Sequence, residues 1–180
     1  EYVESVWWSL AQIWKKGLLV QDHRVAPYCP RCGTGLSDHE LAQGYENITD
    51  QSVYVKFPIT SGPLEKLGAS FLVWTTTPWT LVSNTAIAVH PEVNYVLAER
   101  DDERYIVAED LLAVLGDGFT VVQSFKGSDL EHTKYQRPFD WIDIPDAHFI
   151  VLAEYVTTTD GTGLVHQSPA FGADDLQVCR

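Results

Sequence analysis

The feature that most constrains the fold is a series of short segments, rich in β-branched and aromatic residues, that begins after Ser52. Runs of this kind, bounded by Pro, Gly and Asp, are typical of β-strands joined by tight turns. We expect one helix among them, at residues 109–115, because Gly116 follows as a stop signal. We expect strands at residues 53–57, 70–74, 85–89, 94–98, 104–108, 120–125 and 149–153. The pattern predicts a mostly β fold with α insertions (α+β), arranged as a closed or nearly closed β-barrel.

The beginning of the chain has a helical pattern instead. Between Tyr2 and Lys16 apolar residues recur every three or four positions, and Gly17 follows. This spacing predicts an amphipathic helix. We therefore expect two parts, namely a helix and a cysteine knuckle in residues 1–45 that pack on the barrel, and the barrel itself in residues 46–180.

Composition excludes several classes of function. A chain of 180 residues with 45% hydrophobic content can bury the core of one compact domain. It has no apolar run long enough to span a bilayer, so we expect no membrane partner and a cytoplasmic location. The balance of 12 Lys and Arg against 25 Asp and Glu gives a net charge of −13. Such a charge opposes tight binding to RNA by this chain alone.

The cysteines indicate half of a metal site. Cys29 and Cys32 lie in a Cys-x-x-Cys turn, where two thiolates can reach one tetrahedral zinc ion. His23 or His39 would have to complete four ligands, and their spacing matches no known arrangement. We expect Cys179 to be an ordinary buried thiol. Three cysteines, an odd number, fit a reducing compartment better than a disulfide framework.

Residues 74–80, with the sequence Trp-Thr-Thr-Thr-Pro-Trp-Thr, form the first motif of functional interest. They could be a strand with surface threonines that ends at Pro78. However, β-branched threonines have few rotamers, so their hydroxyls would be held at fixed positions. Pro78 also restricts the backbone of Thr77. The segment therefore predicts hydroxyl and amide groups gathered at a turn.

The second motif lies near the end of the chain, where a Gly-Thr-Gly bend at residues 161–163 precedes His166. Alone, His166 would be a structural histidine, and Asp174 and Asp175 would be helix-starting residues favoured by the helix dipole. Taken together, they place an imidazole and a carboxylate beside a flexible bend. A carboxylate is the natural partner of an ammonium group. We expect a pocket for a small polar ligand with an ammonium, without a Ser-His-Asp triad or a phosphate-binding loop.

These two motifs resemble the editing domain of isoleucyl-tRNA synthetases. A third match, Gly-x-x-Leu-x-x-x-x-Tyr-x-x-Pro-Phe at residues 127–139, fits the same family. The residues after the threonines, Pro78 and Trp79 followed by Leu81 and Asn84, are similar to the isoleucine enzymes. The resemblance covers essentially the whole chain. It implies the β-barrel editing fold of the Val/Ile/Leu type and a fragment of a larger synthetase.

The resemblance also implies an activity, which is hydrolytic proofreading of misactivated valine. The substrate would be the ester of valyl-tRNA(Ile), with valyl-adenylate as a further candidate. ATP binding and aminoacylation would lie elsewhere, because the chain has neither a His-Ile-Gly-His nor a Lys-Met-Ser-Lys-Ser signature. Editing would need no cofactor, whereas the full-length protein could hold zinc at Cys29 and Cys32 with partner ligands from outside this chain. We expect the isolated chain to fold without zinc.

By resemblance, Asp175 holds the substrate ammonium, and the catalytic set is Asp175, His166, Thr77 and Thr76. The substrate-binding set adds the residues that would line the pocket. It comprises Trp74, Thr75, Thr80, Trp79, Asn84, Asp175 and His166. The expected partners are the 3′ end of mischarged valyl-tRNA(Ile), valyl-adenylate and the rest of the synthetase, and we expect a monomer.

Other functions remain open at this point. The chain could edit another small aliphatic amino acid, or it could be a non-catalytic module that binds amino acids. A zinc-dependent interaction domain is a further alternative.

Overall fold

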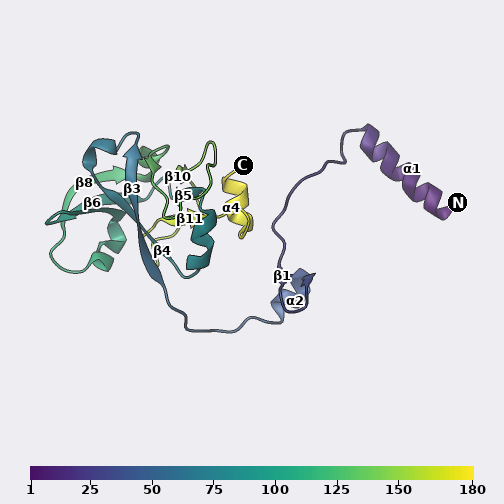
Figure 1. The fold of residues 1–180 in the computed structure, drawn as a ribbon, viewed down its shortest axis with the longest axis horizontal. Helices are drawn as coiled ribbons and strands as arrows, with labels where there is room; N and C mark the ends of the chain where they lie inside the picture. Colours follow the sequence, from purple (N-terminus) through teal and green to yellow (C-terminus); the bar gives the residue numbers. More distant parts are fainter.

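The computed structural model describes residues 1–180 and shows a small N-terminal region connected by an extended segment to a β-sheet region (Figure 1). The N-terminal elements are α1 (Tyr2–Lys15), β1 (Tyr28–Cys29), β2 (Thr34–Gly35) and α2 (Asp38–Ala42). The larger region starts with β3 (Val53–Ser61), η1 (Glu65–Leu67), β4 (Ser70–Thr75), η2 (Pro78–Ser83), β5 (Ala86–Val89), β6 (Asn94–Arg100) and β7 (Glu103–Ala108). It ends with η3 (Glu109–Leu115), β8 (Thr120–Lys126), α3 (Gly127–Leu130), β9 (Lys134–Tyr135), β10 (Phe149–Leu152), β11 (Val165–Gln167) and α4 (Ala173–Val178).

The strands of the larger region form one mixed sheet of nine, in the order β11-β5-β10-β9-β3-β4-β7-β6-β8, while β1 and β2 pair with each other. The mostly β prediction is confirmed. The expectation of a closed barrel is corrected, because β11 and β8 at the two ends of this order are not paired. β3 joins the two halves: it pairs with β4 along its first part and with β9 at Ile59 and Ser61, with a register shift between these two pairs. The helix expected at residues 109–115 is a 3-10 helix.

Burial explains why these segments are strands. All four residues of β5 are buried, and β4 buries four of its six. Strands that are covered on both faces have continuous apolar sequences. β5 and β4 are of this kind, and each pairs with a parallel neighbour. The main core gathers side chains from both halves of the sheet, among them Phe57, Phe71 and Ile150. Packing across this core holds β11 close to β4, although the two strands are not hydrogen-bonded.

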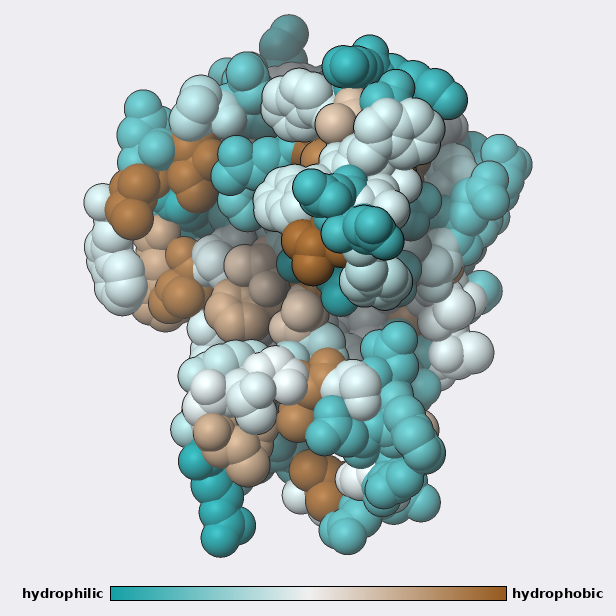
Figure 2. All heavy atoms as spheres, turned by 90° about the vertical axis from the view of Figure 1, so that its right-hand side faces the viewer, coloured by the Kyte–Doolittle hydropathy of each residue, from teal (hydrophilic) through white to brown (hydrophobic).

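The N-terminal region differs from the sheet, because none of residues 1–52 is buried. The periodicity predicted α1 correctly, but its apolar face has no cover: Trp7 is 68% exposed and Trp14 65%. The view from this end shows hydrophobic side chains lying open among hydrophilic ones (Figure 2). The expected packing of α1 on the barrel is therefore absent. Arg180 links the two regions, since it pairs with Asp22 at 2.7 Å and donates to the carbonyl of His23 at 2.6 Å. No helix has the length and hydropathy required to cross a membrane.

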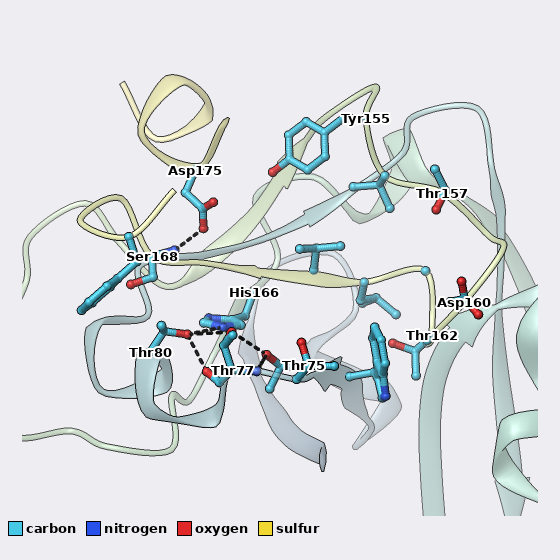
Figure 3. Close-up of a pocket in the computed structure, with 18 of the residues that line it drawn as sticks. Thr75, Thr77, Thr80, Tyr155, Thr157, Asp160, Thr162, His166, Ser168 and Asp175 are labelled. Carbon is cyan, nitrogen blue, oxygen red and sulfur yellow. Dashed lines mark hydrogen bonds between the residues drawn. The ribbon is translucent and has the colours of Figure 1, made fainter. Parts of the chain in front are cut away.

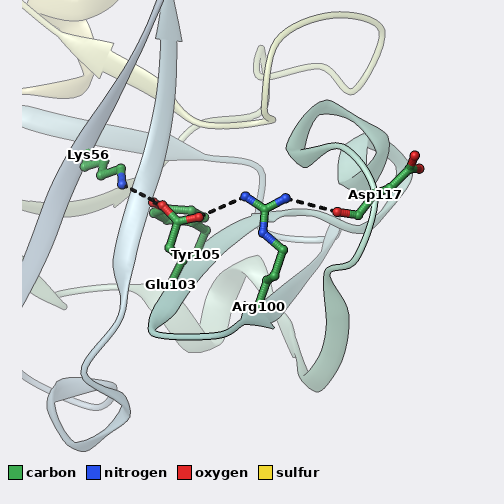
Figure 4. A network of polar contacts seen from close by, with 5 residues as sticks. All are labelled: Lys56, Arg100, Glu103, Tyr105 and Asp117. Carbon is green, nitrogen blue, oxygen red and sulfur yellow. Dashed lines mark hydrogen bonds and ion pairs between the residues drawn. The ribbon is translucent and has the colours of Figure 1, made fainter.

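The acidic run at residues 101–103 is more than the solvated turn that its sequence suggests. Glu103 at the start of β7 accepts hydrogen bonds from the Tyr105 hydroxyl at 2.6 Å, Lys56 at 3.1 Å and Arg100 at 3.0 Å (Figure 4). Arg100 also donates to the backbone of Asp117 at 3.0 Å. The Tyr105 hydroxyl, then Lys56 and Arg100, lower the pKa of Glu103 to about 2. This network joins β3, β6 and β7 on the surface of the sheet.

Candidate functional site

A cavity of about 570 Å³ lies where the two sequence motifs meet (Figure 3). One wall is the end of β4 with η2, and the other is the segment that leads into β11, followed by the start of α4. Eight of the nine predicted site residues line this cavity: Trp74, Thr75, Thr76, Thr77, Trp79, Thr80, His166 and Asp175. The fold thus brings together side chains that are up to a hundred positions apart in the sequence. The role of each one remains a prediction.

The threonine turn is held by its own hydroxyls. The Thr75 hydroxyl accepts from the backbone N–H of Thr77 at 3.1 Å and contacts the Thr77 hydroxyl at 3.2 Å. Pro78 then starts the 3-10 helix η2, at a position where its fixed φ suits a helix and its missing N–H costs nothing. A 3-10 helix has three residues per turn, so Thr77, Thr80 and Ser83 lie above one another on one side.

His166 is fixed in β11 and faces this row of hydroxyls. Its strand pairs with β5, and the side chain is only 7% exposed. The Nε2 atom lies 2.9 Å from the Thr80 hydroxyl, whereas Nδ1 is buried and has no partner. Burial lowers the pKa of His166 below its ordinary value, and the negative charge of Asp175 opposes that shift. The ring is therefore neutral at physiological pH.

Two glycines shape the bend before β11. Gly161 and Gly163 have φ of 75° and 74°, a region that residues with a Cβ avoid. A Cβ on Gly161 would also lie 2.9 Å from the Trp74 ring. Between them, Thr162 is 1% exposed, lines the cavity and has an unpaired hydroxyl. The Tyr95 hydroxyl donates to the carbonyl of Gly163 at 2.7 Å, which ties the bend to the core.

Asp175 lies in the first turn of α4, half-buried at the edge of the cavity. Its Oδ1 atom accepts from the backbone N–H of Ser168 at 2.6 Å, and Oδ2 has no hydrogen-bond partner. A Cβ on Gly172 would lie 2.0 Å from Oδ2, so only glycine leaves room for the carboxylate there. Asp174 is exposed and does not line the cavity. The carboxylate of Asp175 can therefore accept from a donor on a ligand.

The cavity is acidic. Asp160 and Asp175 are its charged side chains, and no lysine or arginine lines it. Sequence reasoning missed part of this wall, namely Tyr155, Val156, Thr157, Thr159, Asp160 and Ser168. The polar run at residues 157–160, directly before the Gly-Thr-Gly bend, is a signal that could have found three of these six. The wall favours a cation and a neutral polar group over a phosphate.

Asn84 is the predicted substrate contact that the structure places elsewhere. It is fully buried and does not line the cavity. Its amide nitrogen donates to the carbonyl of Ala86 at 2.9 Å, and its amide oxygen accepts from the Tyr135 hydroxyl at 2.7 Å. With both ends of the amide in use, Asn84 connects η2 to the core. The substrate contact suggested by the sequence is therefore corrected to a structural position.

The cysteine knuckle lies in the N-terminal region, away from the cavity. The Cys32 backbone N–H approaches the Cys29 sulfur at 3.4 Å, and this contact lowers the pKa of the Cys29 thiol. Nowhere do three or more His, Cys, Asp or Glu residues lie close enough together to bind a metal ion. Neither His23 nor His39 lies with the two thiols in such a group, and the half-site at Cys29 and Cys32 stays a prediction. Cys179, predicted to be buried, is exposed.

Comparisons with known proteins agree with this geometry. Residues 1–159 match the family model of the class I tRNA synthetases (I, L, M and V). The chain is 68% identical to an isoleucine–tRNA ligase of Thermobifida fusca and 67% identical to one of Streptomyces coelicolor. Each match covers 100% of this chain but 17% of the relative, so the chain spans about a sixth of their length.

Solved structures show the same fold. The editing domain of the P. knowlesi cytosolic leucyl-tRNA synthetase superposes with a TM-score of 0.56. The match has 14% sequence identity and covers 69% of this chain and 60% of that one. At this level of identity the likeness concerns the fold.

Proposed function

Because this chain belongs to the class I tRNA synthetases for isoleucine, leucine, methionine and valine, we propose that its cavity is a hydrolytic editing site that removes valine from mischarged valyl-tRNA(Ile). The observation that carries the proposal is the cavity itself, where a free carboxylate oxygen, a neutral imidazole and a row of hydroxyls surround one space. The likeness to a protein solved as an editing domain supports it. The high identity to isoleucine–tRNA ligases supports isoleucine as the cognate amino acid.

Asp175 binds the α-ammonium of the amino acid. Its Oδ2 atom is free and its Oδ1 atom is held by Ser168, so the carboxylate is already oriented when the ligand arrives. A charge-assisted hydrogen bond at the edge of a partly dry cavity fixes the ligand's orientation as well as adding affinity. The amino-acid side chain then points along the wall that carries Thr80 and His166.

The threonine turn orients the ester. Thr76 and Thr77 are exposed to the cavity and offer hydroxyl groups beside backbone amides. A water molecule attacks the ester carbonyl, which needs less activation than an amide. The free hydroxyl of the terminal ribose relays a proton: it takes one from the attacking water and gives its own to the leaving ribose oxygen, so that valine and the uncharged 3′ end are released. No covalent intermediate with a side chain is required.

The charge of the cavity favours the ester over the adenylate. An aminoacyl-adenylate carries a phosphate next to the acyl group, and this cavity offers that phosphate two aspartates and no cationic side chain. The ester at the 3′ end of a tRNA places a neutral ribose in the same position. The substrate is therefore valyl-tRNA(Ile) first, and valyl-adenylate second.

The selection of valine over isoleucine is steric. Attraction through one added methylene gives only about 1–3 kcal/mol, which is too little for accurate synthesis, so a second site must exclude the larger side chain. Thr80 and His166 are both buried in the wall and are held against each other, so the wall cannot easily yield. Trp74 and Trp79 complete it.

The experiment is a deacylation assay with tRNA charged in turn with valine, isoleucine and another small aliphatic amino acid. We expect valyl-tRNA(Ile) to be hydrolysed fastest. In His166→Ala the ratio of isoleucyl to valyl hydrolysis should rise, even if both rates fall, because the variant enlarges the space for the side chain. Equal losses of both activities would mean that His166 contributes to chemistry or general binding and that other residues form the sieve.

Two alternatives are outcomes of the same assay. Preferred cleavage of a different aminoacyl-tRNA would make the site an editing site for that amino acid. Binding of free valine without any hydrolysis would make it a non-catalytic module. For any tRNA substrate, the remainder of the synthetase holds the body of the tRNA, since this chain carries a net charge of −13. Zinc, if the longer protein holds it, would use Cys29 and Cys32 with ligands from outside this chain.

A further inference from the structure

The position of one proton can be deduced at the Thr80 hydroxyl. A threonine hydroxyl has a single proton to donate. Thr80 Oγ1 lies 2.8 Å from the carbonyl oxygen of Thr77, which can only accept, and 2.9 Å from His166 Nε2, which can do either. If Thr80 donates to Thr77, then His166 must donate from Nε2 to Thr80.

The opposite arrangement is poorer by one hydrogen bond. If Thr80 donated to Nε2, its bond to the Thr77 carbonyl would be lost, and the proton of the neutral ring would lie on Nδ1. Nδ1 is buried and has no partner, so an N–H would then be left unsatisfied. In the first arrangement both short contacts are hydrogen bonds, and Nδ1 carries only an unpaired acceptor lone pair.

The hydroxyl row keeps Thr80 in this position. Ser83, one 3-10 turn further along η2, donates to the carbonyl of Thr80 at 3.0 Å. Because its single proton is used, Ser83 must accept from the hydroxyl of Ser168, which it contacts closely. The backbone N–H of Ser168 in turn donates to Asp175. Thr80 thus holds His166 in β11, and Ser83 holds Ser168 directly after it. Figure 3 shows the contacts of Thr80 with His166 and of Ser168 with Asp175.

We propose that Thr80 is a positioning residue that fixes His166 in the Nε2–H tautomer and leaves Nδ1 as the free acceptor of the ring. This tautomer does not depend on the proposed function. Its consequence for editing does rest on that function: with Nε2–H held by Thr80 and Nδ1 buried, His166 is a neutral wall residue and not an acid that protonates the leaving ribose. Burial lowers the pKa of His166 and so favours the neutral ring.

The test is a long-range ¹H–¹⁵N correlation spectrum of the labelled 180-residue chain, recorded above the ordinary His pKa of about 6.5. The spectrum distinguishes a protonated from an unprotonated ring nitrogen, and the signals of His166 are those absent from His166→Gln. We expect a protonated Nε2 and an unprotonated Nδ1 in the wild type. A wild-type ring protonated at Nδ1 would overturn the proposal.

Two substitutions of Thr80 separate positioning from packing. Thr80→Val keeps the volume and removes the hydroxyl, so His166 should become a mixture of tautomers, whereas Thr80→Ser should keep the wild-type pattern. A wild-type pattern in Thr80→Val would contradict the proposal. If Thr80→Val does not fold, the wild-type and Thr80→Ser spectra still decide.

Hydrolysis gives an independent readout. With valyl-tRNA(Ile), Thr80→Val should lower kcat about tenfold with little change in KM, and Thr80→Ser, which keeps the hydroxyl, should recover most of that loss. A higher KM with an unchanged kcat would contradict the positioning role and assign Thr80 to packing. If the wild type shows the expected tautomer but no hydrolysis, the proposed function fails while the role of Thr80 stands.

Discussion

The N-terminal region and the sheet region contain similar kinds of apolar residues but use them differently. All 36 buried residues lie between Phe57 and Ser168. α1 carries three tryptophans, all more than 60% exposed. An apolar stripe on a helix thus specifies the helix but not its partner, whereas strands that are paired with one another enclose their own core. The candidate site lies entirely in the sheet region, which contains the hydrophobic core.

The largest expected effect is on stability. Phe71 is fully buried in the main core, so Phe71→Ala should cost about 3–5 kcal/mol. Trp7→Ala removes a still larger but exposed side chain and should change the free energy of unfolding by less than about 0.5 kcal/mol. Denaturant unfolding of both variants measures this difference. A large loss in Trp7→Ala would show that α1 packs on the sheet in solution.

A smaller effect is expected where the core supports the site. Tyr95→Phe leaves the buried N–H of His90 and the carbonyl of Gly163 without the hydroxyl that binds both, at a cost of about 1–3 kcal/mol. The matched control is Tyr54→Phe in β3, where the ring is 50% exposed and we expect almost no change. Equal stabilities of the two variants would mean that the Gly-Thr-Gly bend is held by other contacts.

The smallest effect concerns the surface network around Glu103. Its pKa is lowered from 4.5 to about 2 in the folded chain, so its contribution to stability is present above pH 4.5 and is lost as the pH falls toward 2. Glu103→Gln should therefore flatten the decline in stability across that window and leave the rest of the pH profile unchanged. Unfolding curves at a series of acidic pH values decide. An unaltered decline would assign the acid sensitivity to other carboxylates.

Much of the sheet could be predicted from local sequence. The segments expected at residues 70–74 and 104–108 are β4 and β7 within one residue, because short runs rich in aromatic and aliphatic residues and bounded by turn residues leave few other options. The three residues of β11 and the two of β9 were too short to show a pattern. The failure of the barrel to close depends on how distant strands pair, which no local pattern contains.

The site was predictable in its residues but not in its connections. The resemblance carried by the two motifs pointed to Thr80, His166 and Asp175, and the fold brings them to one cavity. The contact between Thr80 and His166 spans 86 positions, so it could not be inferred from spacing. Asn84 follows the first motif at the end of η2, yet the chain turns it into the core. A motif identifies candidates, and only the fold decides which of them face a ligand.

The central claim is that Asp175 anchors the substrate of a hydrolytic site, and one pair of variants tests it most directly. Asp175→Asn removes the charge that faces the cavity, and Asp174→Asn removes an exposed neighbouring charge of the same helix turn. With valyl-tRNA(Ile), the account predicts a fall in kcat/KM of about 30- to 150-fold for Asp175→Asn, since loss of a partly buried charge partner costs about 2–3 kcal/mol. Asp174→Asn should stay within about threefold of the wild type. Equal activity of the two variants would contradict the account.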